Sequence, residues 1–141
     1  MTLAVFSHRR RFAAVAVVLA LTGCSPGVKL APVKGTVLYG DKAAEGATVV
    51  FHPKGGGQGT PTPSGTVQAD GSFTLRTHPH GDGAPPGEYV VLVTLYPPDA
   101  RQQENPVNKL PARFANPDQT PLRATVQDGA TELEPFKIPL K

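Results

Sequence analysis

The stretch Glu88-Tyr-Val-Val-Leu-Val-Thr-Leu95 is the most continuous apolar run downstream of residue 31, and it decides the fold class. A valine-rich run of this length, bounded by turn residues, is typical of a buried β-strand. Tyr96-Pro97-Pro98 ends the run, because proline cannot donate a hydrogen bond to a strand ladder. We therefore predict a central, well-buried strand over residues 88–95.

Shorter segments on both sides of this run alternate apolar and polar residues with a period of two. They cover residues 33–39, 47–52, 65–69, 72–77, 122–126 and 131–140. Asp70-Gly71 and Asp128-Gly129 stand between such segments, and Asp-Gly is a strong hairpin signal because primed turns require positive φ. Pro135 and Pro139 mark the last segment as an edge or bulged strand. About seven short strands without a convincing helix predict an all-β sandwich.

Long connections separate these strands, and Asp99–Thr120 is the longest. Its three prolines argue against a helix. Long loops on rigid sandwiches often carry function, so this loop is our first candidate for a partner contact. Its charges nearly balance, which predicts no strong preference for charged partners: Arg101, Lys109 and Arg113 stand against Asp99, Glu104 and Asp118.

Several segments together suggest a family for the whole region. They are Val33–Val37 followed by Glu45–Phe51, Ala69–Leu75, Pro85–Val91, Leu110–Pro117 and Thr120–Leu122. In this order they resemble the carboxypeptidase regulatory-like, or transthyretin-like, domains found in small bacterial lipoproteins. The resemblance implies a seven-stranded Greek-key sandwich that usually serves as a non-catalytic accessory. Fold alone does not define function.

The N-terminus carries a second informative stretch, Leu21-Thr22-Gly23-Cys24, which contains the only cysteine. Before it, Arg9-Arg10-Arg11 leads into ten apolar residues, 12–21. Ten is too few for a membrane-spanning helix, which needs about 20. It lies within the roughly 7–15 residues of a signal-peptide core, and the arginines favour a cytoplasmic N-terminus. A buried core helix and an ordinary secretory signal with a chance cysteine are the alternatives.

This stretch resembles a bacterial lipoprotein signal peptide with its lipobox. The resemblance implies cleavage between Gly23 and Cys24 and attachment of lipid to the Cys24 sulfur. We accordingly expect a signal peptide at residues 1–23, a tether at residues 24–31 and the sandwich domain at residues 32–141. The protein would sit at the cell membrane or outer membrane, facing the periplasm or exterior. Ser25 is not an aspartate-type retention signal, which favours the outer membrane where both exist.

The charge of the mature chain excludes one class of partner. The chain has 14 Lys and Arg against 11 Asp and Glu. Because three of the arginines lie in the predicted signal peptide, the remaining 118 residues carry 11 of each and no net charge. Without a basic patch, nucleic-acid binding is not expected. With its cysteine acylated, the domain would form no disulfide although it is exported.

Catalytic and metal sites have weak support in the sequence. His78-Pro79-His80-Gly81-Asp82 offers two imidazoles and a carboxylate, which are ligand types for zinc or copper. The alternative to a metal site is a solvated loop, because His52 is the only other histidine after residue 24. Ser64 and Ser72 lack a nucleophile motif. The sequence ends Lys137–Lys141, without the Tyr-Arg-Gly-Ser of the transthyretin-related hydrolases of purine breakdown.

The sequence therefore predicts a non-enzymatic, lipid-anchored cell-envelope protein without a cofactor. Its sandwich would act as a binding or structural module for another envelope protein. The alternative is a ligand- or metal-binding protein that uses His78, His80 and Asp82. Four aromatic residues fit either a ligand surface or the core and its corners: Tyr39, Tyr89, Tyr96 and Phe114.

Overall fold

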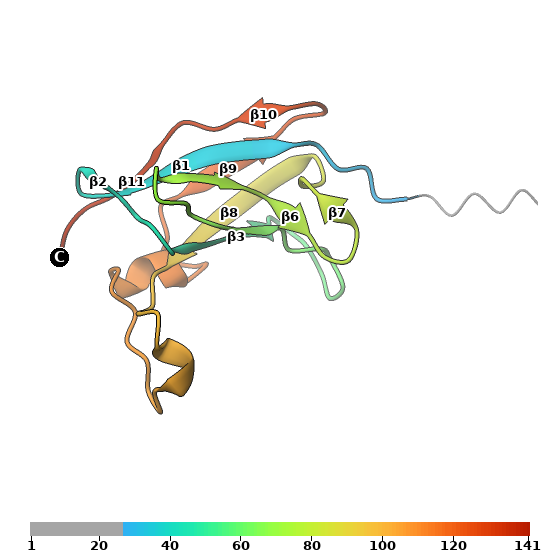
Figure 1. Ribbon diagram of the computed structural model, residues 1–141. Coiled ribbons are helices and arrows are strands. Elements are labelled where there is room, and N and C mark those ends of the chain that lie inside the picture. The colour runs from blue at the N-terminus through green and yellow to red at the C-terminus, as the bar shows by residue number, and fades with distance from the viewer. Residues whose placement is uncertain (1–26) are drawn as a thin grey trace, which may run out of the picture.

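The structure is a computed structural model that describes residues 27–141. It is mostly β, with two sheets that pack as an all-β sandwich (Figure 1). The predicted cleavage site, the predicted lipidation residue Cys24 and residues 24–26 of the predicted tether lie outside the described residues.

The first sheet is built around one long strand, β1 (Val33–Tyr39). On one side β1 pairs in parallel with β10 (Thr131–Glu132) and β11 (Phe136–Ile138). It also pairs antiparallel with β2 (Lys42–Ala43) and β5 (Ser72–Thr74). The last segment is thus broken between β10 and β11 and pairs only with β1, as its prolines predicted.

The second sheet is antiparallel, in the order β7-β6-β4-β3-β8-β9. Its strands are β3 (Thr48–Pro53), β4 (Ser64–Thr66), β6 (Arg76–Thr77), β7 (Gly81–Asp82), β8 (Gly87–Thr94) and β9 (Arg123–Val126). The continuous apolar run over residues 88–95 forms most of β8, which lies between β3 and β9. The expected strand over residues 88–95 is confirmed within one residue at each end.

An aromatic cluster joins the two sheets in the core. Phe51 and Tyr89 come from the second sheet and Phe73 and Phe136 from the first, and all four are buried. Phe51 lies 5.5 Å from Tyr89, 6.4 Å from Phe73 and 6.5 Å from Phe136, measured between ring centroids. Edge-on and tilted contacts at these distances add about 0.5–1.5 kcal/mol per pair beyond area burial.

The two Asp-Gly turns differ from the predicted primed hairpins. At the first, Gly71 has φ +86° while Asp70 does not have a positive φ. Gly71 N donates to Gln68 O, and Gln68 N donates to Ser72 O, which makes a three-residue loop with glycine at the left-handed position. At the second, the chain passes from β9 in one sheet to β10 in the other, so no hairpin forms. A dipeptide signals a turn, but the strand pairing decides its type.

The long connection contains two 3₁₀ turns, η1 (Ala100–Gln102) and η2 (Ala112–Ala115), and no α-helix. Figure 1 shows η1 in a loop that projects from the sandwich, at the end opposite to residues 27–31. At that other end Ala31 bridges to Ala84, shortly before β8 starts. The projecting loop follows the last residue of β8, so the eight residues of this strand separate the two features by about 25 Å.

Candidate functional site

The projecting loop, residues 96–107, is closed at its base by one asparagine. Asn108 Oδ1 accepts hydrogen bonds from the backbone N–H of Leu95 (2.9 Å) and of Leu110 (3.1 Å). Lys109 N also donates to Leu95 O, at 2.8 Å. Loops of 6–16 residues with their ends held together are compact units that frequently carry function. The base of this loop is therefore fixed to the end of β8.

The position of Asn108 leaves one of its own polar atoms without a hydrogen bond in the described part of the chain. Its Nδ2 atom is buried and has no hydrogen-bond partner among residues 27–141. A buried donor without a partner costs about 1–3 kcal/mol, so such a group in a native fold calls for an explanation. The two bonds to Oδ1 provide one, because they keep the start and the end of the projecting loop together.

The remainder of the long connection packs against β8. Leu110 and Phe114 are buried side chains of the core. Thr120 is buried as well, and its hydroxyl donates to Val91 O at 2.9 Å. Leu122 N in turn donates to the Thr120 hydroxyl oxygen. The loop expected over Asp99–Thr120 thus has two parts: its first residues, up to 107, belong to the projecting loop, and the rest packs against the sandwich.

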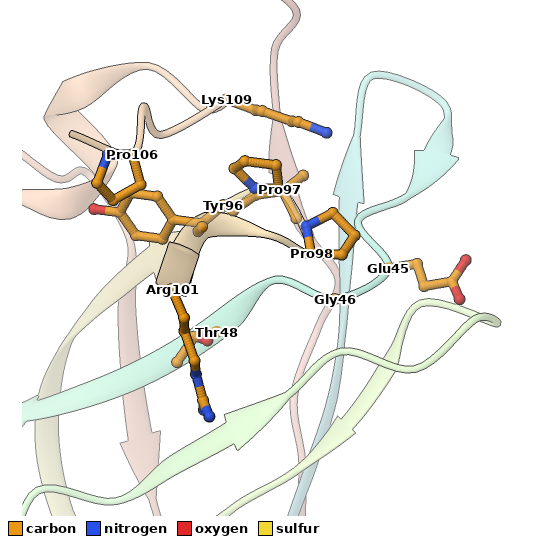
Figure 2. A pocket seen from close by; sticks show the side chains of 11 residues that line it. Glu45, Gly46, Thr48, Tyr96, Pro97, Pro98, Arg101, Pro106 and Lys109 are labelled. Carbon is orange, nitrogen blue, oxygen red and sulfur yellow. The ribbon is translucent and has the colours of Figure 1, made fainter. Parts of the chain in front are cut away.

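A groove of about 800 Å³, here called the loop groove, lies between the projecting loop and the start of β3 (Figure 2). Tyr96, 44% exposed, and the adjacent prolines give it an apolar strip. Its lining is Glu45, Gly46, Thr48, Leu95, Tyr96, Pro97, Pro98, Ala100, Arg101, Pro106 and Lys109. Pockets of 300–1,000 Å³ with few polar groups are typical of ligand sites.

Two cations flank the apolar strip. Figure 2 shows Lys109 and Arg101 on opposite sides of Tyr96 and the prolines, with the Glu45 carboxylate directed away from both. Neither cation belongs to the ion pairs found within residues 27–141, which join Lys29 to Asp128, Lys54 to Glu88 and Arg76 to Asp82. The acids Asp99 and Glu104 do not line the loop groove.

Arg113, the third basic residue of the long connection, does not line the loop groove. The Arg113 guanidinium lies 4.9 Å from the centroid of the Phe114 ring, within range of a cation–π contact. The acidic and basic residues of the long connection balance in number, but two of its three cations line the loop groove and none of its acids does. The groove therefore has more positive charge than the sequence of the connection suggests.

A second, polar depression continues from the loop groove. This sheet trough, about 380 Å³, is lined by residues of β3 and β4 and of the segment that runs from β5 through β7, and Thr48 lines both hollows. It is lined by Thr48, Ser64, Gly65, Thr66, Thr74, Leu75, Arg76, His78 and Asp82. Four of these side chains carry hydroxyl groups. The two hollows together form a path that is apolar at the loop and polar over the sheet.

The structure spreads the predicted metal ligands over an exposed hairpin. His78, His80 and Asp82 are all exposed. The Asp82 carboxylate lies 3.4 Å from Arg76 Nε, with which it forms an ion pair. Nowhere in residues 27–141 do three His, Cys, Asp or Glu side chains gather so that they could hold a metal ion.

The four aromatic candidates divide between core and surface. Tyr89 and Phe114 are buried and Tyr39 is half-buried against the core, while Tyr96 is exposed and lines the loop groove. Of the two roles that the sequence left open for Tyr96, ligand surface or core, the exposed position fits the surface, whereas Pro97 and Pro98 were predicted only to end the strand. The sequence signal for an exposed apolar strip was an aromatic residue next to two prolines, directly after a buried strand.

In comparisons with known proteins, neither a family model nor a curated protein sequence matches the chain. In the part of the chain that the structure describes, no helix has the length and apolar character needed to cross a membrane.

Proposed function

We propose that this protein is a non-enzymatic, lipid-anchored binding module of the cell envelope, held through Cys24 with its loop groove directed away from the membrane. One observation carries the proposal: the chain enters the sandwich at Ala31, and the groove lies at the opposite end of β8. A tether at one end and a fixed loop at the other suit a domain that presents a surface at a distance from its attachment.

The anchor itself is supported by the sequence. Arg9–Arg11, the ten apolar residues and the lipobox ending at Cys24 fit a lipoprotein signal peptide. Two or more acyl chains make attachment stable, whereas a single chain binds only marginally. Absence of an aspartate after the cysteine supports the outer membrane where an organism has two membranes.

We also propose the finer fold, a seven-stranded Greek-key sandwich of the transthyretin-like, carboxypeptidase regulatory-like type. Two pairs of short strands support this count. Only Leu75 separates β5 from β6, and three residues separate β10 from β11, so each pair can be treated as one interrupted strand. With β1, β3, β4, β8 and β9, these make seven principal strands when the two-residue strands β2 and β7 are left out of the count.

The test compares native protein with a Cys24→Ser variant in fractionated cells, with Ser25→Ala as the matched control. We expect native protein and Ser25→Ala in the membrane fraction, labelled by a fatty-acid analogue, and Cys24→Ser unlabelled and released from it. Equal release of native protein and Cys24→Ser would contradict the anchor.

Crosslinking in the same membranes tests the binding role. A photoreactive residue in place of Val107, which is 72% exposed on the projecting loop, should capture an envelope component in repeated experiments. A matched probe at Lys137, on the first sheet, should not capture that component. Equal capture from both positions would contradict a role for the loop groove.

A further inference from the structure

The loop groove and the sheet trough together have a chemistry that selects among extended ligands. At one end the path offers an apolar strip of Tyr96 and prolines, flanked by Arg101 and Lys109, which join none of the ion pairs of residues 27–141. At the other end it offers the hydroxyl groups of Thr48, Ser64 and Thr66. Any single ligand on the whole path needs apolar faces, many hydrogen-bonding groups and negative charge.

Peptides fit this path poorly. One mode of peptide binding adds a strand to a sheet through main-chain hydrogen bonds. The trough instead presents mainly polar side chains, four of which carry hydroxyl groups. Pro97, Pro98 and Pro106 have no N–H to donate. Amphipathic helices require a groove that is apolar along its length, whereas the trough is lined mainly by polar side chains.

We propose that the loop groove and the sheet trough bind an anionic polysaccharide. Sugar rings carry apolar C–H faces that pack on Tyr96 and the prolines, and their hydroxyl groups exchange hydrogen bonds with the threonines and Ser64. Carboxylates on the polymer pair with Arg101 and Lys109, in charge-assisted hydrogen bonds stronger than neutral ones. This proposal rests on the binding role proposed above and names its ligand class.

The charge pattern supports an anionic rather than a neutral polymer. Arg101 and Lys109 have no carboxylate partner among the ion pairs of residues 27–141, whereas Arg76 in the trough faces Asp82. Exposed cations without a partner keep their full attraction for an incoming anion, and salt weakens that attraction. Glu45, the one acid of the loop groove, points away from both cations.

The test measures binding of the purified full chain to three soluble polymers by calorimetry. Alginate supplies sugar rings with carboxylates, dextran supplies neutral sugar rings, and poly-L-glutamate supplies carboxylates on a peptide. We expect alginate to bind at least about tenfold more tightly than either of the others, with an affinity that falls as salt rises. Poly-L-glutamate or dextran binding as tightly as alginate, or no binding of alginate, would overturn the proposal.

Variants locate the binding on the surface. Arg101→Gln with Lys109→Gln should weaken alginate binding about tenfold or more. Lys42→Gln with Lys137→Gln removes the same charge from exposed positions of the first sheet and should leave binding unchanged. Tyr96→Ala should weaken binding while Tyr96→Phe, which keeps the ring, should not. Equal losses in the two double variants would overturn the site, and unchanged melting curves exclude unfolding as the cause.

Failure of this proposal can be told apart from failure of the proposed function. Membrane attachment through Cys24 and capture from position 107 are measured in cells and do not depend on alginate. A protein that stays anchored and captures one component, but ignores alginate, keeps the binding role and loses the anionic polysaccharide.

Discussion

Tyr89 joins the core and the surface in one side chain. Its ring is 5.5 Å from Phe51, and its hydroxyl donates to Pro85 O at 2.6 Å, four residues upstream. Tyr89→Phe keeps the ring and removes the hydrogen bond. We expect a loss of about 1 kcal/mol in the free energy of unfolding, measured by urea denaturation. An unchanged free energy would show that water replaces Tyr89 at Pro85 O.

The same residue gives stability a dependence on alkaline pH. Burial raises the pKa of Tyr89 above its ordinary value of 10.0. Because the folded state favours the neutral phenol, its contribution is complete below pH 10 and is lost as pH rises through the folded-state pKa. We expect Tyr89→Phe to lose less stability than native protein when pH is raised beyond 10. Parallel curves would contradict the shift.

The pKa of Asp70, at an exposed turn, is shifted in the opposite direction to that of Tyr89. The hydroxyl and the backbone N–H of Ser72 both donate to Asp70 Oδ1, and these bonds lower the pKa of the carboxyl below 3.8. The stability gained here is present above that pH and is lost as pH falls through the lowered pKa. In an NMR titration, Ser72→Ala should raise the Asp70 pKa part of the way back, since the backbone bond remains.

At the scale of elements, Gly35 makes room in β1 for an aromatic ring of its neighbour β5. A Cβ atom at this position would lie 2.6 Å from Phe73 Cζ. Gly35→Ala should therefore cost about 1–3 kcal/mol in the free energy of unfolding. Gly57→Ala, where a Cβ atom meets nothing within 4 Å, is the control and should change it little. Similar losses in both variants would contradict this packing argument.

The projecting loop depends on a single side-chain oxygen. Asn108→Ala leaves Leu95 N and Leu110 N without their acceptor, so hydrogen exchange at both amides should accelerate. We expect a cost of about 1–3 kcal/mol, mostly as local opening of the loop. Asn108→Asp keeps Oδ1 and should preserve protection of these amides. Fast exchange in Asn108→Asp as well would show that the lost amide group, not the acceptor, held the loop.

The strands and the loop groove show which parts of the structure could be predicted from the sequence. Period-two patterns predicted β1 and β3, because buried and exposed side chains alternate on a strand, and the continuous apolar run predicted β8; both signals are local. Pairing is not local: nothing near Asp128-Gly129 indicates that the chain changes sheets there. The loop groove was missed for a similar reason. Tyr96 and Thr48 are far apart in the sequence, and only the pairing of β3 with β8 brings their surroundings together.

For the whole molecule, the arrangement of tether and loop has a consequence for orientation. The β6–β7 hairpin lies at the end where the chain enters the sandwich, since a Cβ atom at Gly81 would be 3.9 Å from Leu30 Cδ1. Val107 lies at the other end, about 25 Å away along β8. In an anchored protein, fluorophores attached at His80→Cys and Val107→Cys should therefore sit at different heights above the membrane.

Energy transfer to an acceptor in the lipid headgroups measures that difference. We expect weaker transfer from position 107 than from position 80 on vesicles carrying the lipidated protein. Equal transfer would mean that the sandwich lies flat on the membrane. Stronger transfer from position 107 would place the loop groove against the lipid, where an external polysaccharide could not reach it.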